Sequence, residues 1–386
     1  MTDLPDSAAP TPPTRRGLLK TLAALGALSV TGGAPSALAA PSATPRLPLR
    51  VGLVLPARSL YPDLGAAFTR GVRAGAPGQA VELLTYSTGP LPREAAQAAQ
   101  AALDDGCEAL ILLGDGLAAA LAGLLHARPV PVLAAELGAL LPGTHRPAPL
   151  TVTLSLRTWE AEWGHGQALA RSASGAAVHL LMSDVEAGYD LQYAFSAGFT
   201  AAGGTLAGST VFASRRPDVA GAVDAVRVSG ARAAHVLASG QGAEVILALQ
   251  QAGLSVTKGG LTAPGLAGVP SVLAAPSRAD GLASAALGDD AGHPGAQLGF
   301  DAGRWMVAGL SSLPATAGAL AQYSGLMHAA VPGARGPLRA NESGLAGTPL
   351  WRRGGGLPDK PLADGPAGLH RGEDLRSGWL YTYLHA

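Results

Sequence analysis

Residues 47–56 read LPLRVGLVLP and residues 107–114 read CEALILLG. Each is a short apolar run followed by a longer segment of helical periodicity, which predicts a buried strand followed by a helix. Between them, residues 61–75 place Leu64 and Phe68 on one face of a predicted helix. Short apolar runs that alternate with amphipathic helices indicate βαβ units and a mostly parallel sheet. We therefore expect an α/β fold.

The same alternation continues along the chain. Further strands are predicted at 80–88, 129–135, 151–155, 176–183, 205–212 and 231–239. Further helices are predicted at 92–106, 117–127, 157–173, 188–204, 219–230 and 242–254. A proline-rich connection at 140–150 separates two series of elements, which indicates two similar α/β lobes in tandem. After residue 330 the chain is rich in Gly, Pro and Arg, and we expect hairpins and loops packed on a lobe.

Composition limits the classes of partner. The 386 residues suffice for two domains with sizeable cores, and the 27 Lys and Arg balance the 27 Asp and Glu. This balance, without a long run of one sign, argues against a nucleic-acid or membrane-surface binder and favours a small, roughly neutral partner. The single cysteine, Cys107, excludes an internal disulfide and is expected to be a small buried hydrophobe.

The N-terminus has the pattern of an export signal. Residues 14–40 read TRRGLLKTLAALGALSVTGGAPSALAA, in which Arg15 and Arg16 precede an apolar stretch and a small-residue site at 37–39. This predicts a twin-arginine signal over residues 1–39, handled by the Tat translocase and cut before Ala40. The alternative is an amphipathic N-terminal helix. No later apolar run approaches the roughly 18 residues that span a bilayer, so we expect a soluble periplasmic or otherwise extracytoplasmic protein.

Three stretches resemble a known family. Residues 51–75, 178–208 and 296–310 are similar, in order and spacing, to the leucine/isoleucine/valine-binding family of type I periplasmic binding proteins. The resemblance implies two Rossmann-like lobes with parallel sheets, joined by a three-stranded hinge. Lobe 1 would comprise 48–156 with 280–328, and lobe 2 would comprise 157–279 with 329–386.

The resemblance also implies a function. A small polar molecule, such as an amino acid or an amide, would bind between the lobes at the carboxyl ends of strands and the N-termini of helices. Closure would bury the ligand and present the protein to the permease of an ABC importer. The resemblance implies no cofactor and no enzymatic activity.

The loops that contact ligand in this family depart from the usual pattern. After the third strand, where the family has Ser or Thr, this chain has Asp115 between two glycines, and after the fourth strand it has Glu136. Carboxylates there would repel a ligand carboxylate, so we expect a ligand with amine, amide or hydroxyl donors. In the second lobe the family's aromatic residue before Gly188 is absent, and Glu186 occupies this region beside Tyr189.

These comparisons and the ends of the predicted strands select the candidate ligand-binding residues. They are Ser59, Tyr61, Asp115, Gly116, Glu136, Glu162, Asp184, Glu186, Tyr189 and Gln241. Each has a structural alternative: Asp115 would cap its helix, Glu162 would be favoured by a helix dipole, and the others would be ordinary loop polarity.

One motif favours another class of protein. Residues 114–119, GDGLAA, fit G-x-G-x-x-A, with Glu136 twenty residues beyond Gly116, as in a dinucleotide-binding fingerprint. An exported NAD-dependent dehydrogenase is therefore an alternative, although the motif lies in the third βα unit and no catalytic His or Lys constellation accompanies it. A ligand-binding partner of a membrane sensor is a further alternative. The nine histidines show no zinc-ligand spacing, so no metal is expected.

Overall fold

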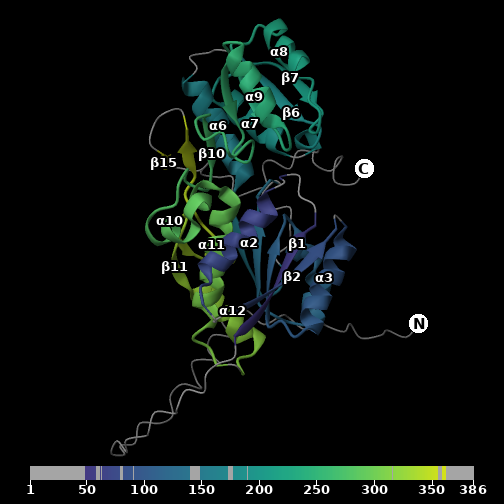
Figure 1. Cartoon of the computed structure of the whole chain (residues 1–386), viewed down its shortest axis with the longest axis vertical. Helices are drawn as coiled ribbons and strands as arrows, with labels where there is room; N and C mark the ends of the chain where they lie inside the picture. The colour runs from purple at the N-terminus through teal and green to yellow at the C-terminus, as the bar shows by residue number, and fades with distance from the viewer. Residues whose placement is uncertain are drawn as a thin grey trace, which may run out of the picture. The chain divides into compact units, whose positions relative to one another are not determined.

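The computed structural model describes residues 48–57, 61, 63–78, 81–89, 91–139, 148–172, 177–188, 190–314, 316–354 and 359–361. The chain divides into the segment Met1–Pro45 and the compact unit Arg46–Ala386. The predicted export signal at 1–39 lies outside the described residues. All elements below belong to the compact unit (Figure 1).

The first sheet has the strand order β13-β5-β4-β3-β1-β2, and each neighbouring pair is parallel. Its strands are β1 (Leu49–Pro56), β2 (Val81–Thr88), β3 (Ala109–Leu113), β4 (Val132–Glu136), β5 (Thr151–Ser155) and β13 (Leu345–Ala346). Every residue of β3 is buried, as expected of a strand whose two faces are both covered. The short apolar runs were therefore correctly predicted as buried strands.

Helices cover both faces of the first sheet. The core on one face joins its strands to α2 (Leu64–Gly75), α11 (Pro294–Leu310) and α12 (Ala319–His328). The core on the other face joins them to α3 (Pro92–Asp104), α4 (Leu117–Ala120) and α5 (Ala122–Ala127). A continuous helix was predicted at 117–127, but it is divided at Leu121. The Leu121 N–H bonds to the carbonyls of both Leu117 and Ala118, which tightens the chain there.

Glycines let α2 and α11 pack closely, side by side in Figure 1. A Cβ on Gly71 would lie 2.1 Å from the carbonyl oxygen of Ala296, and a Cβ on Gly299 would lie 2.1 Å from that of Phe68. Both distances are far below a van der Waals contact. The two helix backbones therefore touch at positions that only glycine can occupy.

The second sheet is also parallel, with the order β7-β6-β8-β9. Its strands are β6 (Val178–Ser183), β7 (Leu206–Phe212), β8 (Ala233–Leu237) and β9 (Ser255–Lys258). One core joins it to α8 (Val219–Val228) and α9 (Gly242–Gln251), and another joins it to α6 (Thr158–Ser172) and α7 (Leu191–Ala201). The short helix η1 (Glu186–Gly188) follows β6. These two groups of elements match the two predicted α/β lobes.

A small antiparallel sheet, β10-β14-β15, packs against α6 through Val272, Ala274 and Leu350. Its strands are β10 (Ser271–Leu273), β14 (Trp351–Arg353) and β15 (Lys360–Pro361). The remaining elements are α10 (Gly281–Leu287), η2 (Gly288–Gly292), β11 (Ala330–Gly333) and β12 (Gly336–Arg339). The segment after residue 329 was assigned to lobe 2, but Val331 and Leu338 lie in the core of the first sheet and β13 pairs with β5. The buried apolar side chains at 330–346 therefore pack with lobe 1, whereas Leu350 and β14 pack with β10 and α6.

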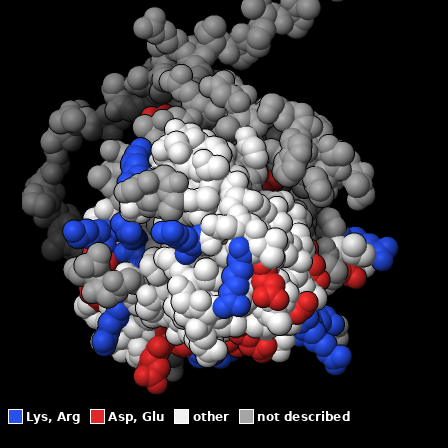
Figure 2. Space-filling model, turned by 90° about the horizontal axis from the view of Figure 1, so that it is seen from above, with Lys and Arg blue, Asp and Glu red and all other residues white. Residues whose placement is uncertain are grey.

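The face shown in Figure 2 carries Lys and Arg as well as Asp and Glu, and some groups of opposite sign lie side by side. A duplex-binding surface would instead gather one sign of charge along a continuous strip. On this face, the charge distribution agrees with the composition.

Candidate functional site

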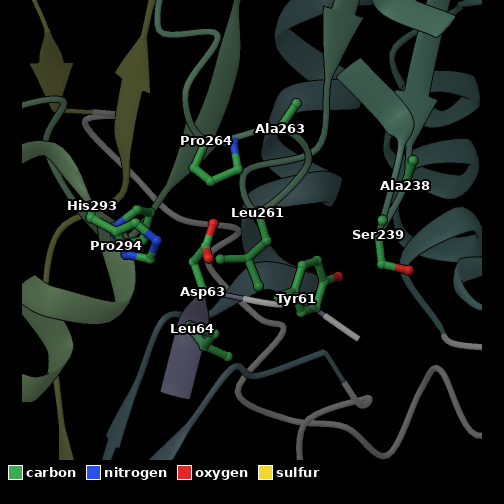
Figure 3. Close-up of a pocket in the computed structure, with 11 residues that line it drawn as sticks. Tyr61, Asp63, Leu64, Ala238, Ser239, Leu261, Ala263, Pro264, His293 and Pro294 are labelled. Atoms are coloured by element: carbon green, nitrogen blue, oxygen red, sulfur yellow. The ribbon is translucent and has the colours of Figure 1, made fainter. Parts of the chain in front are cut away.

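A pocket with a volume of about 150 Å³ lies where loops of the two lobes meet (Figure 3). It is formed by the loop between β1 and α2, the loop after β8, the loop between β9 and β10, and the start of α11. The lining residues are Tyr61, Asp63, Leu64, Ala238, Ser239, Gly240, Leu261, Ala263, Pro264, His293 and Pro294. In parallel α/β sheets the carboxyl ends of strands are the usual position of a ligand site, and β1 and β8 both end here.

Helices α2, α9 and α11 all begin near this pocket. Their first turns carry backbone N–H groups without helical partners and a partial positive charge, which favour an anionic or carbonyl group of a ligand. Asp63, at the N-cap of α2, makes no side-chain capping bond. In Figure 3 its carboxylate points into the pocket between His293 and Leu261. The pocket thus combines apolar walls with a few polar groups.

Ser239 and His293 offer hydrogen bonds from different sides. The Ser239 side chain is buried at 2% exposure, and its Oγ has no hydrogen-bond partner among the described residues. The Nδ1 of His293 accepts the N–H of Gly295 at 3.1 Å as the cap of α11, so the neutral ring carries its proton on Nε2. Burial lowers the pKa of His293, which favours this neutral form. Both residues can therefore donate to a ligand.

A direct hydrogen bond joins the lobes beside the pocket. The Tyr61 hydroxyl of lobe 1 donates to Oε1 of Glu186 in lobe 2 at 2.5 Å. Glu186 is 1% exposed, and its Oε2 has no hydrogen-bond partner among the described residues. Burial raises the pKa of Glu186 to about 7, against the opposing effect of the Tyr61 hydroxyl. The structure thus brings together two residues that the sequence selected separately.

Glu162 lies in the interior of lobe 2 and does not line the pocket. Its Oε2 accepts from Nε2 of His235 at 2.9 Å, and its Oε1 accepts the N–H of Gly260 at 3.2 Å. Burial raises the pKa of Glu162 to about 7 and lowers the pKa of Lys258, near Glu162, to about 7. Glu162 therefore supports the loop that leads to the pocket residues Leu261, Ala263 and Pro264.

Asp115 and Glu136 lie together at the ends of β3 and β4, outside the lining of the pocket. The Asp115 carboxylate accepts the N–H groups of Leu137, Gly138 and Ala139 at 2.5, 3.0 and 2.7 Å. Asp115 therefore holds the loop after β4, a role that differs from the helix cap considered above. Gly116, with φ +70°, donates its N–H to Glu136 at 3.4 Å. Burial, and then the charge of Asp115, raise the pKa of Glu136 to about 7.

Replacing Asp115 with alanine should lower the free energy of unfolding by about 1 to 3 kcal/mol, because the three N–H groups lose their acceptor. Urea denaturation measures this change. The matched control is Asp224, an exposed residue whose ion pair with Arg227 is long, at 3.9 Å. Its alanine variant should change the free energy of unfolding by less than about 0.5 kcal/mol. Equal effects of both variants would contradict the role given to Asp115.

Of the remaining candidate ligand-binding residues, two follow strands of the second sheet and two lie outside the described residues. Asp184 accepts the N–H groups of Val185 and Ser214, at 3.0 and 2.9 Å. Hydrogen bonds from the side chain and then the backbone of Ser214 lower the pKa of Asp184. Gln241 is exposed at the N-cap of α9 and makes no side-chain cap. Ser59 and Tyr189 lie outside the described residues.

The dinucleotide-binding alternative gains little from the geometry. The helix that follows the GDGLAA motif, α4, has four residues, and a helix this short offers only a small dipole to a pyrophosphate. Within the described ranges, no cluster of His, Cys, Asp or Glu suited to a metal ion occurs. No helix in those ranges is long and apolar enough to span a membrane.

The candidate residues predicted from the sequence do not include Asp63, Ser239, His293 or the loop 261–264. A signal was present for His293, because a polar residue directly before Pro294 is typical of a helix start. Ser239 likewise follows the apolar run of β8. Nothing local indicated the loop 261–264, whose position depends on the packing of β9 and β10.

Comparisons with known proteins agree with this architecture. The model of a family described as periplasmic binding protein matches residues 48–297, well over half of the chain. A comparison with curated proteins returned no match.

Several solved structures share this fold, among them solute-binding proteins of ABC transporters. One, of an ABC transporter from R. palustris in complex with benzoate, is 20% identical with a TM-score of 0.67, over 82% of this chain and 95% of that one. Another from R. palustris, with 4-hydroxybenzoate, is 18% identical with a TM-score of 0.63, over 82% and 98%. A leucine-binding protein from Thermotoga maritima is 18% identical with a TM-score of 0.61, over 79% and 94%. At this identity the likeness establishes the fold.

Proposed function

The chain belongs to the periplasmic binding protein family, and on that premise we propose that it is an extracytoplasmic solute-binding protein of an ABC importer. It captures a small molecule between its lobes and presents the closed, loaded form to the membrane permease. The observation that carries the proposal is the pocket lining, which includes Tyr61 from lobe 1 and Ser239 from lobe 2. A site built from both lobes couples binding to closure.

The ligand we propose is a small compound with an apolar body and an acid or amide group, such as an amino acid, an amide or a related carboxylate. Leu64, Leu261 and Pro264 supply apolar walls, while Ser239 and His293 supply donors near the N-termini of α9 and α11. The structural neighbours that hold benzoate and 4-hydroxybenzoate, and the leucine-binding protein, make such compounds reasonable probes.

The preference for amines and amides over carboxylates depended on ionised carboxylates of Asp115 and Glu136 facing the ligand. Asp115 is hydrogen-bonded to three backbone N–H groups, and the raised pKa of Glu136 reduces its charge near neutral pH. Repulsion of a ligand carboxylate by this pair is therefore weaker than the sequence indicated, and carboxylates remain within the proposed class.

To bind solute outside the cytoplasm the protein must be exported, and we propose that this occurs through the twin-arginine translocase. The basis is the sequence pattern of Arg15 and Arg16 followed by the small-residue site at 37–39. The mature protein then begins near Ala40 in the periplasm or its equivalent.

The Ser239→Ala variant tests the proposed site. We expect its dissociation constant for the ligand to rise tenfold or more, because a hydrogen bond to a charged group contributes about 1.5 to 3 kcal/mol. The probe is the compound that co-purifies with the protein, identified by mass spectrometry after denaturation. Leucine, leucinamide, benzoate and 4-hydroxybenzoate are titrated calorimetrically in parallel.

The matched control is Ser209→Ala, an exposed serine of β7 in the same lobe. It should bind with unchanged affinity. If Ser239→Ala binds as tightly as the wild type, the pocket of Figure 3 is not the ligand site. If the bound compound is recovered chemically altered, the protein is an enzyme and the proposed function is wrong.

A further inference from the structure

The strongest feature beyond the pocket is the hydrogen bond between the lobes. Tyr61, in the loop after β1, reaches Glu186 of η1, and these residues are 125 positions apart in the chain. Glu186 is buried, and its hydrogen-bond donor comes from the opposite lobe. Any opening of the lobes that separates this pair removes the donor and admits water to the carboxyl group.

We propose that the Tyr61–Glu186 contact is a proton-dependent latch, so that the lobes close and hold ligand when Glu186 is protonated and release it when Glu186 ionises. The inference rests on the proposed function, because it assumes that opening and closing of the lobes controls the ligand. It adds a regulation of the same site by pH.

The surroundings of Glu186 disfavour its charged form. Glu162 of α6, when it is ionised, repels a second carboxylate, and burial raises its own pKa to about 7. Asp184, earlier in the same loop, is bonded to Val185 and Ser214. Tyr61 provides one hydrogen bond, and no ion pair to Glu186 occurs in the described part of the chain. An ionised Glu186 would thus be a buried charge without a cation beside it.

The other titratable groups near this contact, two histidines and a lysine, interact with Glu162. His235 of β8 donates to Glu162, and His165 of α6 lies beside His235 with ring centroids 5.1 Å apart. Burial lowers the pKa of both histidines to about 3, so they stay neutral over the range of interest. Lys258 of β9 donates to the Thr262 carbonyl at 2.8 Å. Its positive charge lowers the pKa of Glu162, whereas it is not among the groups that shift the pKa of Glu186.

The direction of the pH effect follows from the two states. In the closed state burial raises the pKa of Glu186 to about 7, whereas in an open state exposed to water it would return towards its ordinary value of 4.5. The closed state therefore binds more protons between these values. The preference for closure is complete below the open-state pKa and is lost as the pH rises through about 7.

The test first follows the lobes without ligand. Spin labels at exposed positions of the two lobes, Arg93→Cys and Val228→Cys in a Cys107→Ala background, report the distance between α3 and α8. Between pH 5.5 and 7.0 the closed-to-open ratio of the wild type should fall about tenfold or more. Glu186→Gln, which keeps the shape but cannot ionise, should be closed to the same extent throughout.

A second carboxyl with a raised pKa provides the control. Glu136 of lobe 1 also has a pKa of about 7, but its hydrogen bond goes to Gly116 of the same lobe, so Glu136→Gln should keep the pH dependence. Tyr61→Phe should extend the transition to higher pH, because it removes the group that lowers the pKa of Glu186. Thermal unfolding confirms that each variant is folded.

Each outcome of these experiments supports or overturns the proposed Tyr61–Glu186 latch. A wild-type distance that does not change with pH, or a pH dependence that survives in Glu186→Gln, overturns it. Failure of the proposed function appears differently, as absence of binding at every pH to the co-purified compound, leucine and benzoate. If binding occurs, its dissociation constant should rise about tenfold from pH 5.5 to 7.0 in the wild type and stay constant in Glu186→Gln.

Discussion

Replacing Asp301 with alanine is expected to lower the free energy of unfolding by about 3 to 5 kcal/mol, because it leaves a buried guanidinium without its counter-charge. Asp301 of α11 and Arg335 of the β11–β12 turn are both 0% exposed, and the Arg335 Nε lies 2.6 Å from Oδ2 of Asp301. Oδ1 of Asp301 also accepts the N–H of Ala334. Urea denaturation gives the change.

The exposed ion pair between Arg70 and Asp290 is the control for Asp301→Ala. It has similar geometry, at 2.6 Å, but the Arg70 side chain is 54% exposed, so Asp290→Ala should cost about 1 kcal/mol or less. The double variant Asp301→Leu/Arg335→Met should recover part of the loss, since it buries no unpaired charge but leaves the Ala334 N–H and the Ser155 carbonyl without their partners. If Asp301→Ala costs no more than Asp290→Ala, the buried pair contributes little to stability.

This ion pair also bears on the movement of the lobes. Nη1 of Arg335 donates to the carbonyls of Ser155 and Ala274, at 2.6 and 3.4 Å. Ser155 ends β5, from which the chain continues into α6 of lobe 2, and Ala274 directly follows β10. Arg335 therefore holds two connecting segments in place, and we expect it to define where the lobes bend.

The Gly71→Val variant should lose about 3 kcal/mol or more of stability, because a side chain there meets the backbone of α11. The facing atoms are the carbonyl oxygen of Ala296, 2.1 Å from the added Cβ, and the N–H nitrogen of Phe300, 2.8 Å from it. Neither can turn aside as a flexible side chain would. The two helices must separate and expose the core that they share with the first sheet. Thermal or urea unfolding measures the loss.

Gly65, in the same helix α2, is the matched control for Gly71. A Cβ on Gly65 meets nothing within 4 Å, so Gly65→Ala should be neutral or stabilising by up to about 1 kcal/mol through helix propensity. A Gly71→Val variant as stable as the wild type would show that the close packing of α2 and α11 is dispensable.

The sequence predicted the secondary structure of both lobes well. The apolar runs at 47–56 and 107–114 became β1 and β3, and the amphipathic segment at 61–75 became α2. These elements were predictable because strands buried on both faces need continuous apolar runs and helices need an apolar stripe. The Gly-, Pro- and Arg-rich tail was not predictable in this way, since Arg335 resembles a loop residue and yet is completely buried.

Composition and periodicity by themselves determined the α/β class and the division into two series of elements, whereas the edge of each sheet at which a ligand would bind was an expectation from the family resemblance. Only the tertiary structure decided that Asp115 is bonded to backbone N–H groups, that Tyr61 meets Glu186, and that Ser239 and His293 line one pocket. The physical reason is that the first set of features depends on residues close together in the sequence, whereas the second depends on residues far apart in it. Periodicity reports which side of a single element is buried, whereas hydrogen bonds and pockets depend on loops from distant elements, whose meeting no local pattern encodes.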